Sequence, residues 1–200
     1  MKREIIETKN VNFIGCWKIE NEKLFSGMIN FFEKNIHLQS KGVTAGSGHN
    51  EEIKKTTNID IDPLFLKNEK FNFLNDYFGE LYKCYNDYKQ QWPFLTKTNS
   101  ALDIPTFTLQ KYIPGDHFSL VHCERNSTIT MHRVFAWMTY LNDVGSDNGS
   151  TYFSHYDVRV KPEMGKTLIW PAEWTHAHAG EILKTDTKYI ISGWMCYPFD

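Results

Sequence analysis

Apolar residues in the first half of the 200-residue chain recur at helical spacing. Residues 24–32 carry apolar side chains three and four positions apart, and Asn21 stands where a helix N-cap is expected. A longer stripe of the same period runs through residues 71–88. Pro93 follows it, and proline ends helices because it lacks a backbone donor and clashes with the preceding turn. The pattern predicts two amphipathic helices.

Three other stretches of the first half lack this period. Residues 13–18, FIGCWK, are typical of a short strand, whereas residues 40–58 are rich in Gly, Ser, Lys and Thr and are typical of a loop. A short alternating piece, residues 59–61, follows and is stopped by Pro63. The loop is favoured as a surface connection, and the alternative is a lid over a site, since long loops in compact domains are often functional.

After about residue 100 the period changes to that of strands. The segments are short, rich in β-branched and aromatic residues, and separated by Gly, Pro, Asn and Asp. They are residues 106–112, 134–141, 150–155, 158–160, 166–170 and 189–197. Six strands of this kind favour a sandwich or jelly-roll barrel. We therefore expect a mainly β fold with supporting helices (α+β) and a double-stranded β-helix core.

The length of the chain fits one domain. We expect residues 1–100 to supply helical support with one or two strands. Residues 101–200 would form the jelly-roll core and carry the functional site.

Charge and cysteine content exclude several classes of protein. The net charge is −2 and the charged residues are well mixed, so no broad cationic field is present for a long nucleic acid. No apolar run is long enough to cross a membrane or to act as a signal peptide, which predicts a soluble, cytoplasmic protein. The four cysteines form no CxxC pair, which argues for isolated thiols and against a zinc knuckle.

The segment KYIPGDHFSLVHCE, residues 111–124, ends in a histidine and a carboxylate separated by one residue. In an extended chain His122 and Glu124 point the same way. Such a pair is two-thirds of the facial triad that holds non-haem Fe(II) and leaves coordination positions open. Candidates for the third ligand are His176 and His178, and since both would share one face of an extended segment, alternation does not choose between them.

The last strand places a lysine where a barrel interior is expected. Lys188 shares a face with Ile190 and Trp194, and burying its charge is costly unless an anion meets it. A dicarboxylate cosubstrate would supply that anion. The alternative is that Lys188 stands at the start of the strand and reaches water, which is the commoner arrangement. Tyr112 and Tyr140 are placed where alternation turns them inward.

For two arginines and two tryptophans near these segments, a structural role is the favoured interpretation. Arg125 and Arg133 could meet an anionic or peptide substrate, but solvated charges at strand ends are the favoured interpretation. Trp174 and Trp194 are expected to be pocket wall or core.

Taken together, these motifs resemble the 2-oxoglutarate- and Fe(II)-dependent dioxygenases of the prolyl 4-hydroxylase-like family. The resemblance covers about half of the chain, roughly residues 106–197. Its motifs are YxPG at residues 112–115, HxE at 122–124, WMTYLND at 137–143, NGSTYF at 148–153, KPEMGKTLIWPAEWTHAHAG at 161–180 and KYIISGW at 188–194. The sequences WPxxWTHxHxG and KYIISGW are also similar to small stand-alone members found in bacteria and in tailed phages. For a phage-encoded protein the location would be the host cytoplasm.

The resemblance implies a role for each candidate. In the family the distal iron ligand precedes the basic cosubstrate residue by about ten positions, which selects His178 with Lys188. Fe(II) would be held by His122, Glu124 and His178. Lys188 would bind 2-oxoglutarate, with Tyr140 as a further hydrogen-bond partner and Tyr112 lining the same pocket. Three positions depart from the common pattern. Glu124 replaces an aspartate, Lys188 replaces an arginine, so that a point charge replaces a planar fork, and Asn148-Gly149 stands where Gly-Gly is usual.

The implied activity is hydroxylation of a substrate C–H bond with consumption of 2-oxoglutarate and O2 and release of succinate and CO2. The substrate would be a peptidyl residue or a small molecule. A rival class is a cupin-like metal-binding isomerase or sugar-binding module without oxygen chemistry, but it has no special use for Lys188 or Tyr140. A non-enzymatic virion or interaction protein ranks last, because the ligands are present.

Overall fold

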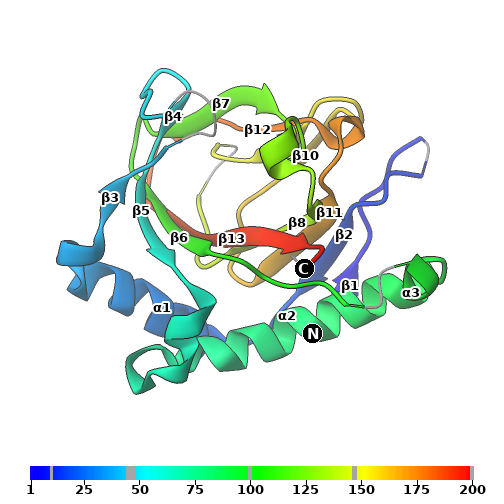
Figure 1. The fold of residues 1–200 in the computed structure, drawn as a ribbon. Coiled ribbons are helices and arrows are strands. Elements are labelled where there is room, and N and C mark those ends of the chain that lie inside the picture. Colours follow the sequence, from blue (N-terminus) through cyan, green and yellow to red (C-terminus); the bar gives the residue numbers. More distant parts are fainter. Residues whose placement is uncertain (10, 44–47, 99–100, 146–147, 199–200) are drawn as a thin grey trace.

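The computed structural model describes residues 1–9, 11–43, 48–98, 101–145 and 148–198. Within these ranges the chain forms two β-sheets that face each other, with helices packed against the outer face of the larger sheet (Figure 1). Neighbouring strands run antiparallel. The mainly β, jelly-roll expectation is confirmed.

The larger sheet has eight strands among the described residues. In spatial order they are β1 (Lys2–Glu4), β2 (Gly15–Lys18), β11 (Lys166–Pro171), β8 (Arg133–Tyr140), β13 (Lys188–Cys196), β6 (Phe107–Tyr112), β5 (Thr57–Ile61) and β3 (Ser40–Lys41). The described part of the smaller sheet has five. They are β10 (Val158–Val160), β9 (Thr151–Phe153), β12 (His178–Gly180), β7 (His117–His122) and β4 (Lys54–Lys55).

The two predicted helices are present as α1 (Glu22–Lys34) and α2 (Phe73–Gln91). Asn21 caps α1 as expected, because its side chain accepts a hydrogen bond from the Leu24 amide. The α2 helix ends before Pro93, and a short helix, α3 (Leu95–Thr98), follows. Single 3₁₀ turns lie at η1 (Ile36–Leu38), η2 (Pro63–Lys67), η3 (Glu69–Phe71), η4 (Thr128–Thr130) and η5 (Trp174–His176).

The central strands of the larger sheet are buried on both faces. On β8, Phe135 and Trp137 pack against the helices, while Met138 and Tyr140 point between the sheets. Alternation along a strand produces this division, since successive side chains leave opposite faces. One hydrophobic cluster therefore holds the helices on the sheet, and a second one surrounds the space between the sheets.

The segment of residues 40–58 differs from the expected loop. It contributes β3, β4 and the first part of β5, and its residues 44–47 lie outside the described residues. Buried polar side chains explain why hydrophobic alternation did not reveal these strands: Thr56 and Asn58 are buried and hydrogen-bonded to each other. The first hundred residues thus supply β1–β5, which is more than the one or two strands expected there.

No helix in the described ranges is both long and apolar enough to cross a membrane.

Candidate active site

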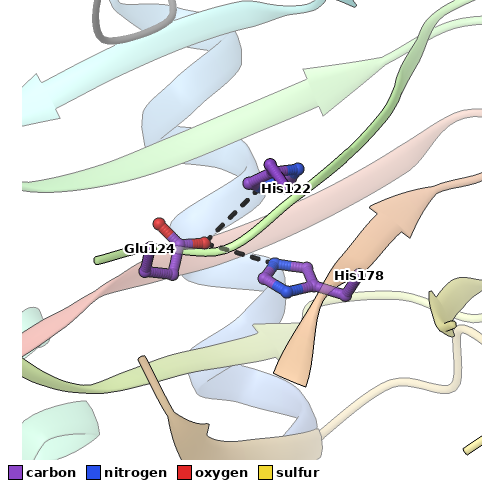
Figure 2. Close-up of side chains that lie close together, drawn as sticks. All are labelled: His122, Glu124 and His178. Carbon is purple, nitrogen blue, oxygen red and sulfur yellow. Dashed lines mark ion pairs between the residues drawn. The ribbon is translucent and has the colours of Figure 1, made fainter. Parts of the chain in front are cut away.

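Three side chains converge between the two sheets. His122 ends β7 and His178 begins β12, and the antiparallel register places these two residues directly opposite each other. Glu124 follows β7, and its backbone amide donates to the Ala172 carbonyl. Glu124 Oε1 lies 3.6 Å from His122 Nε2 and 3.2 Å from His178 Nε2 (Figure 2). One ligand atom from each residue lies within 4.8 Å of the others.

Both imidazoles are oriented by backbone carbonyls. His122 Nδ1 lies 2.8 Å from the Leu120 carbonyl oxygen, and His178 Nδ1 lies 2.9 Å from the His176 carbonyl oxygen. A carbonyl only accepts, so each ring carries a proton on Nδ1 and directs Nε2 at the cluster. Nε2 donates to Glu124 when the ring is protonated and offers a lone pair to a metal when the ring is neutral. This is the arrangement that metal-binding histidines require.

Glu124 is fixed by two further side chains. Trp194 Nε1 donates to Glu124 Oε2 at 2.7 Å, and the Arg133 guanidinium donates to the Glu124 carbonyl at 3.0 Å. Arg133 also stacks on the Trp194 ring, 3.6 Å from its centroid. Burial by itself would raise the pKa of Glu124, but the hydrogen bonds and charges of His122 and His178 outweigh it and hold that pKa well below its usual value. The group is a carboxylate, as a metal ligand must be.

The donor set fits Fe(II). Two neutral imidazoles and one carboxylate, gathered on one side of an open cavity, match the composition of the 2-His-1-carboxylate site. The longer glutamate reaches both histidines while its second oxygen is held by Trp194. The extra methylene therefore leaves the carboxylate within the cluster.

His176 does not join the three residues. It lies in the 3₁₀ turn η5, so the extended geometry that put it on the same face as His178 does not apply. Its Nε2 lies 2.7 Å from the Asn12 carbonyl oxygen, and its Nδ1 lies 2.9 Å from Thr175 Oγ1. Its burial lowers its pKa.

Lys188 lies at another part of the same cavity and is buried, with 3% of its surface exposed. Its ammonium donates to the Gly149 carbonyl at 2.7 Å and lies 4.4 Å from the centroid of the Tyr112 ring. The alternative that Lys188 simply reaches water is wrong. Burial lowers its pKa to about 8, and the charge of Glu181 offsets only part of this effect.

Register places both tyrosines beside the last strand. Tyr112 is the cross-strand neighbour of Lys188, and Tyr140 is the neighbour of Ile190. Both line the cavity. The Tyr112 hydroxyl donates to Gln110 Oε1 at 2.8 Å, and the Tyr140 hydroxyl donates to the Val160 carbonyl at 3.0 Å. Both hydroxyls are therefore already engaged within the protein.

The cavity measures about 130 Å³, and two of its neighbours were not expected from the sequence. Lys54 lines it from β4, inside the segment predicted to be a loop. Arg133, expected to be a solvated charge, is partly buried against Trp194 and Glu124. By contrast Arg125 pairs with Glu173 at 2.7 Å, and Trp174 is 66% exposed rather than part of the pocket wall. No hydrophobic pattern marks Lys54, because its strand is two residues long.

Comparison with known families identifies the class. Residues 107–196 match the model of the 2OG-Fe(II) oxygenase superfamily, a range that includes the three converging residues and Lys188. The matched region is that of a 2-oxoglutarate- and Fe(II)-dependent dioxygenase, whose cofactors are Fe(II), 2-oxoglutarate and O2. A search of curated proteins finds no match.

Solved structures of prolyl hydroxylases share the fold. A Pseudomonas putida prolyl-4-hydroxylase matches with a TM-score of 0.70 and 15% identity over 94% of this chain and 95% of its own. A Trichoplax adhaerens prolyl hydroxylase, solved with a hypoxia-inducible-factor peptide, matches with a TM-score of 0.71 and 13% identity over 94% of this chain and 84% of its own. A viral collagen prolyl hydroxylase from Paramecium Bursaria Chlorella virus-1 matches with a TM-score of 0.65 and 14% identity over 92% of this chain and 96% of its own.

Proposed function

We propose that His122, Glu124 and His178 hold the iron, and that Lys188 binds the distal carboxylate of 2-oxoglutarate. The observation that carries this assignment is the convergence of the three ligand atoms on the cavity in which Lys188 is buried. A buried ammonium needs an anion, and a dicarboxylate provides one. Tyr112 and Tyr140 would flank the cosubstrate from β6 and β8.

Each residue then has a definite task. The carbonyls that accept from the two Nδ1 atoms keep both Nε2 lone pairs aimed at the iron, and Trp194 keeps the carboxylate of Glu124 in place. Lys188 would pair with the distal carboxylate of 2-oxoglutarate, and the apolar walls would exclude water. The bound iron would supply the activation of O2 that couples decarboxylation of 2-oxoglutarate to succinate and CO2 with hydroxylation of a substrate C–H bond.

The substrate is proposed to be a peptidyl residue or a small molecule. The Trichoplax enzyme was solved with a peptide, which supports a peptidyl substrate by analogy of fold. The described cavity is small, so that only one side chain or one small molecule would reach the iron. A cytoplasmic location is proposed because Cys16, Cys84, Cys123 and Cys196 are free thiols.

The proposal is tested by anaerobic titration of the protein with Fe(II) and 2-oxoglutarate. We expect a weak visible charge-transfer band that saturates with both additions. His178→Ala should abolish the band, whereas His176→Ala should retain it in any protein that remains folded by circular dichroism. A wild-type protein that binds Fe(II) but gives no band would contradict the oxygenase assignment and favour a cupin-like metal site.

A further inference from the structure

A second lysine reaches the cavity from the opposite sheet. Lys54 lies on β4, and its cross-strand neighbour on β7 is Phe118. Cross-strand neighbours project from the same face of a sheet. Phe118 and His122 are four residues apart on β7 and both line the cavity, so Lys54 points inward with them. The next residue, Lys55, points to the opposite face and lies 3.4 Å from Asp116 Oδ1.

The ammonium of Lys54 has no anionic partner in the described part of the chain. Only 9% of Lys54 is exposed, and no hydrogen bond or ion pair to its Nζ is present among the described residues. Its Nζ lies 5.1 Å from the centroid of the Phe118 ring. Burying an ammonium without a partner is costly, and a contact with an aromatic face recovers only part of that cost.

The surrounding backbone leaves room for the buried aliphatic part of the Lys54 side chain. Gly42, which follows β3, donates to the Thr56 carbonyl, and a Cβ at Gly42 would lie 2.5 Å from Thr56 Oγ1 and 3.2 Å from Lys54 Cε. The absence of a side chain at Gly42 thus leaves space for the lysine. Lys54 is held as part of the cavity wall rather than as a flexible surface charge.

The charges around the loaded site favour an anion at this position. In the free protein the negative charges of Glu124 and Asp60 attract the Lys54 ammonium. Once Glu124 serves as a ligand of a divalent cation, its negative charge is compensated, and the net charge near Lys54 becomes more positive. Lys188 provides a separate cation for the cosubstrate, with its own contacts to Gly149 and Tyr112.

We propose that Lys54 is a specificity-determining residue that pairs with a carboxylate of the substrate. This inference rests on the proposed oxygenase function and names the substrate class: a molecule or peptide residue that carries a carboxylate close to the carbon that is hydroxylated. The carboxylate comes either from a free α-carboxyl group or from an acidic side chain of a peptide.

The test measures binding without turnover, using protein loaded anaerobically with Zn(II) and 2-oxoglutarate. The probes are the N-acetyl forms of the common amino acids with a free α-carboxylate, the corresponding N-acetyl amides, and the N-acetyl N-methylamides of Asp, Glu, Asn and Gln. Binding is followed by saturation-transfer NMR and quantified by calorimetry. The α-carboxylate probes and the Asp and Glu amides separate the two sources of the carboxylate.

We expect at least one carboxylate probe to bind and its neutral counterpart to bind about 10- to 100-fold more weakly, the range of one charge-assisted hydrogen bond. Lys54→Met should remove this preference, and Lys54→Arg should restore it. Lys55→Met, the same change on the opposite face of β4, should leave it intact. Comparing the melting temperatures of the Met variants identifies loss of fold.

Three outcomes would overturn the inference. They are the absence of binding by every carboxylate probe, equal binding of charged and neutral probes, and a preference that survives in Lys54→Met. A Lys54→Met variant that loses 2-oxoglutarate affinity as strongly as Lys188→Met would assign Lys54 to the cosubstrate instead. Loss of the Fe(II)–2-oxoglutarate band in the wild type would overturn the proposed function itself, whereas failure of the probes with the band intact overturns only the role of Lys54.

Discussion

Glu124 occupies the position where the sequence departs from the commoner aspartate of the resembling family, and its neighbours explain how the longer side chain is held. One carboxylate oxygen faces both imidazoles and the other accepts from Trp194. Arg133 binds the backbone carbonyl of Glu124 and stacks on the same tryptophan. The indole N–H of Trp194 thus orients the Glu124 carboxylate. Hydrogen bonds to a metal ligand from residues outside the coordination shell tune metal affinity.

Trp194→Phe should therefore weaken metal binding. The ring still packs against Arg133, but the hydrogen bond to Glu124 is lost, and we expect Co(II) affinity to fall by about 10- to 100-fold in an anaerobic titration. Trp174→Phe is the matched control, because Trp174 is largely exposed, and its Co(II) affinity should equal that of the wild type. Equal affinities for the two variants would show that Trp194 does not position the ligand.

Lys188 should make 2-oxoglutarate binding dependent on pH. Burial lowers its pKa to about 8 in the free protein, and the dicarboxylate binds only the charged form. A bound anion raises this pKa, so binding takes up a proton above pH 8, and the affinity should fall by about tenfold for each further pH unit. Calorimetry of the Zn(II)-loaded protein between pH 6.5 and 9.5 measures this dependence.

Lys188→Arg provides the control, since a guanidinium stays charged throughout this range. Its affinity, whatever its absolute value, should not decline above pH 8. A decline of the same size in both proteins would assign the titration to another group.

At the scale of elements, the register of paired strands brings the functional residues together. The β12–β7 pair sets His178 opposite His122, and the β13–β6 pair sets Lys188 opposite Tyr112. A shift of one residue would turn every side chain of a strand to the other face. The turns that fix these strands are therefore as important as the residues on them. Gly165, which precedes β11, has a φ of +78° and bonds to both Tyr140 and Ile19.

Gly165→Ala should destabilise the fold strongly. The positive φ strains an L residue, and the added Cβ would collide with the Ile19 carbonyl oxygen, so we expect a loss of at least about 2 kcal/mol in the free energy of unfolding. Urea denaturation measures it. Gly27→Ala is the control, because Gly27 lies in α1 with nothing near its Cβ, and it should stabilise the protein by about 0.5–1 kcal/mol. Similar effects for both changes would contradict this account of Gly165.

At the scale of the molecule, two hydrophobic clusters lie on opposite sides of the larger sheet. One joins α1 and α2 to the sheet, and the other surrounds the cavity between the sheets. The helices and the cavity thus lie on opposite faces of the larger sheet, and Trp137 of the helix-side cluster also lines the cavity (Figure 1). Since the sheet stands between the two clusters, we expect a defect beneath the helices to reduce stability without altering the residues of the cavity.

Leu74→Ala tests this separation. Leu74 is fully buried on α2, and its truncation should lower the free energy of unfolding by about 2–5 kcal/mol. The 2-oxoglutarate affinity of the folded, Zn(II)-loaded protein should remain that of the wild type. Leu64→Ala, at an exposed position, should change the stability by less than about 0.5 kcal/mol. A large loss of cosubstrate affinity in Leu74→Ala would show that the two layers are coupled.

The sequence by itself determined the type of most elements, because helical and strand periods are local properties of the chain. It predicted α1 with its Asn21 cap, α2 and six strands of the second half, but not β7 or β12, and it marked His122, Glu124 and Lys188 as candidates for one site. The single-domain organisation stays a prediction. Between His176 and His178 the residue pattern alone left the choice open, and only the resemblance favoured one of them.

The tertiary structure decided what depends on partners distant in the chain. It shows that η5 turns His176 away, that Lys188 is buried instead of reaching water, and that Trp194 and Arg133 hold Glu124. It also brings Lys54 to the cavity by pairing β4 with β7, although the Gly-, Ser-, Lys- and Thr-rich composition predicted a loop there. The physical reason is that burial and cross-strand contacts are set by register between segments, which no local period records.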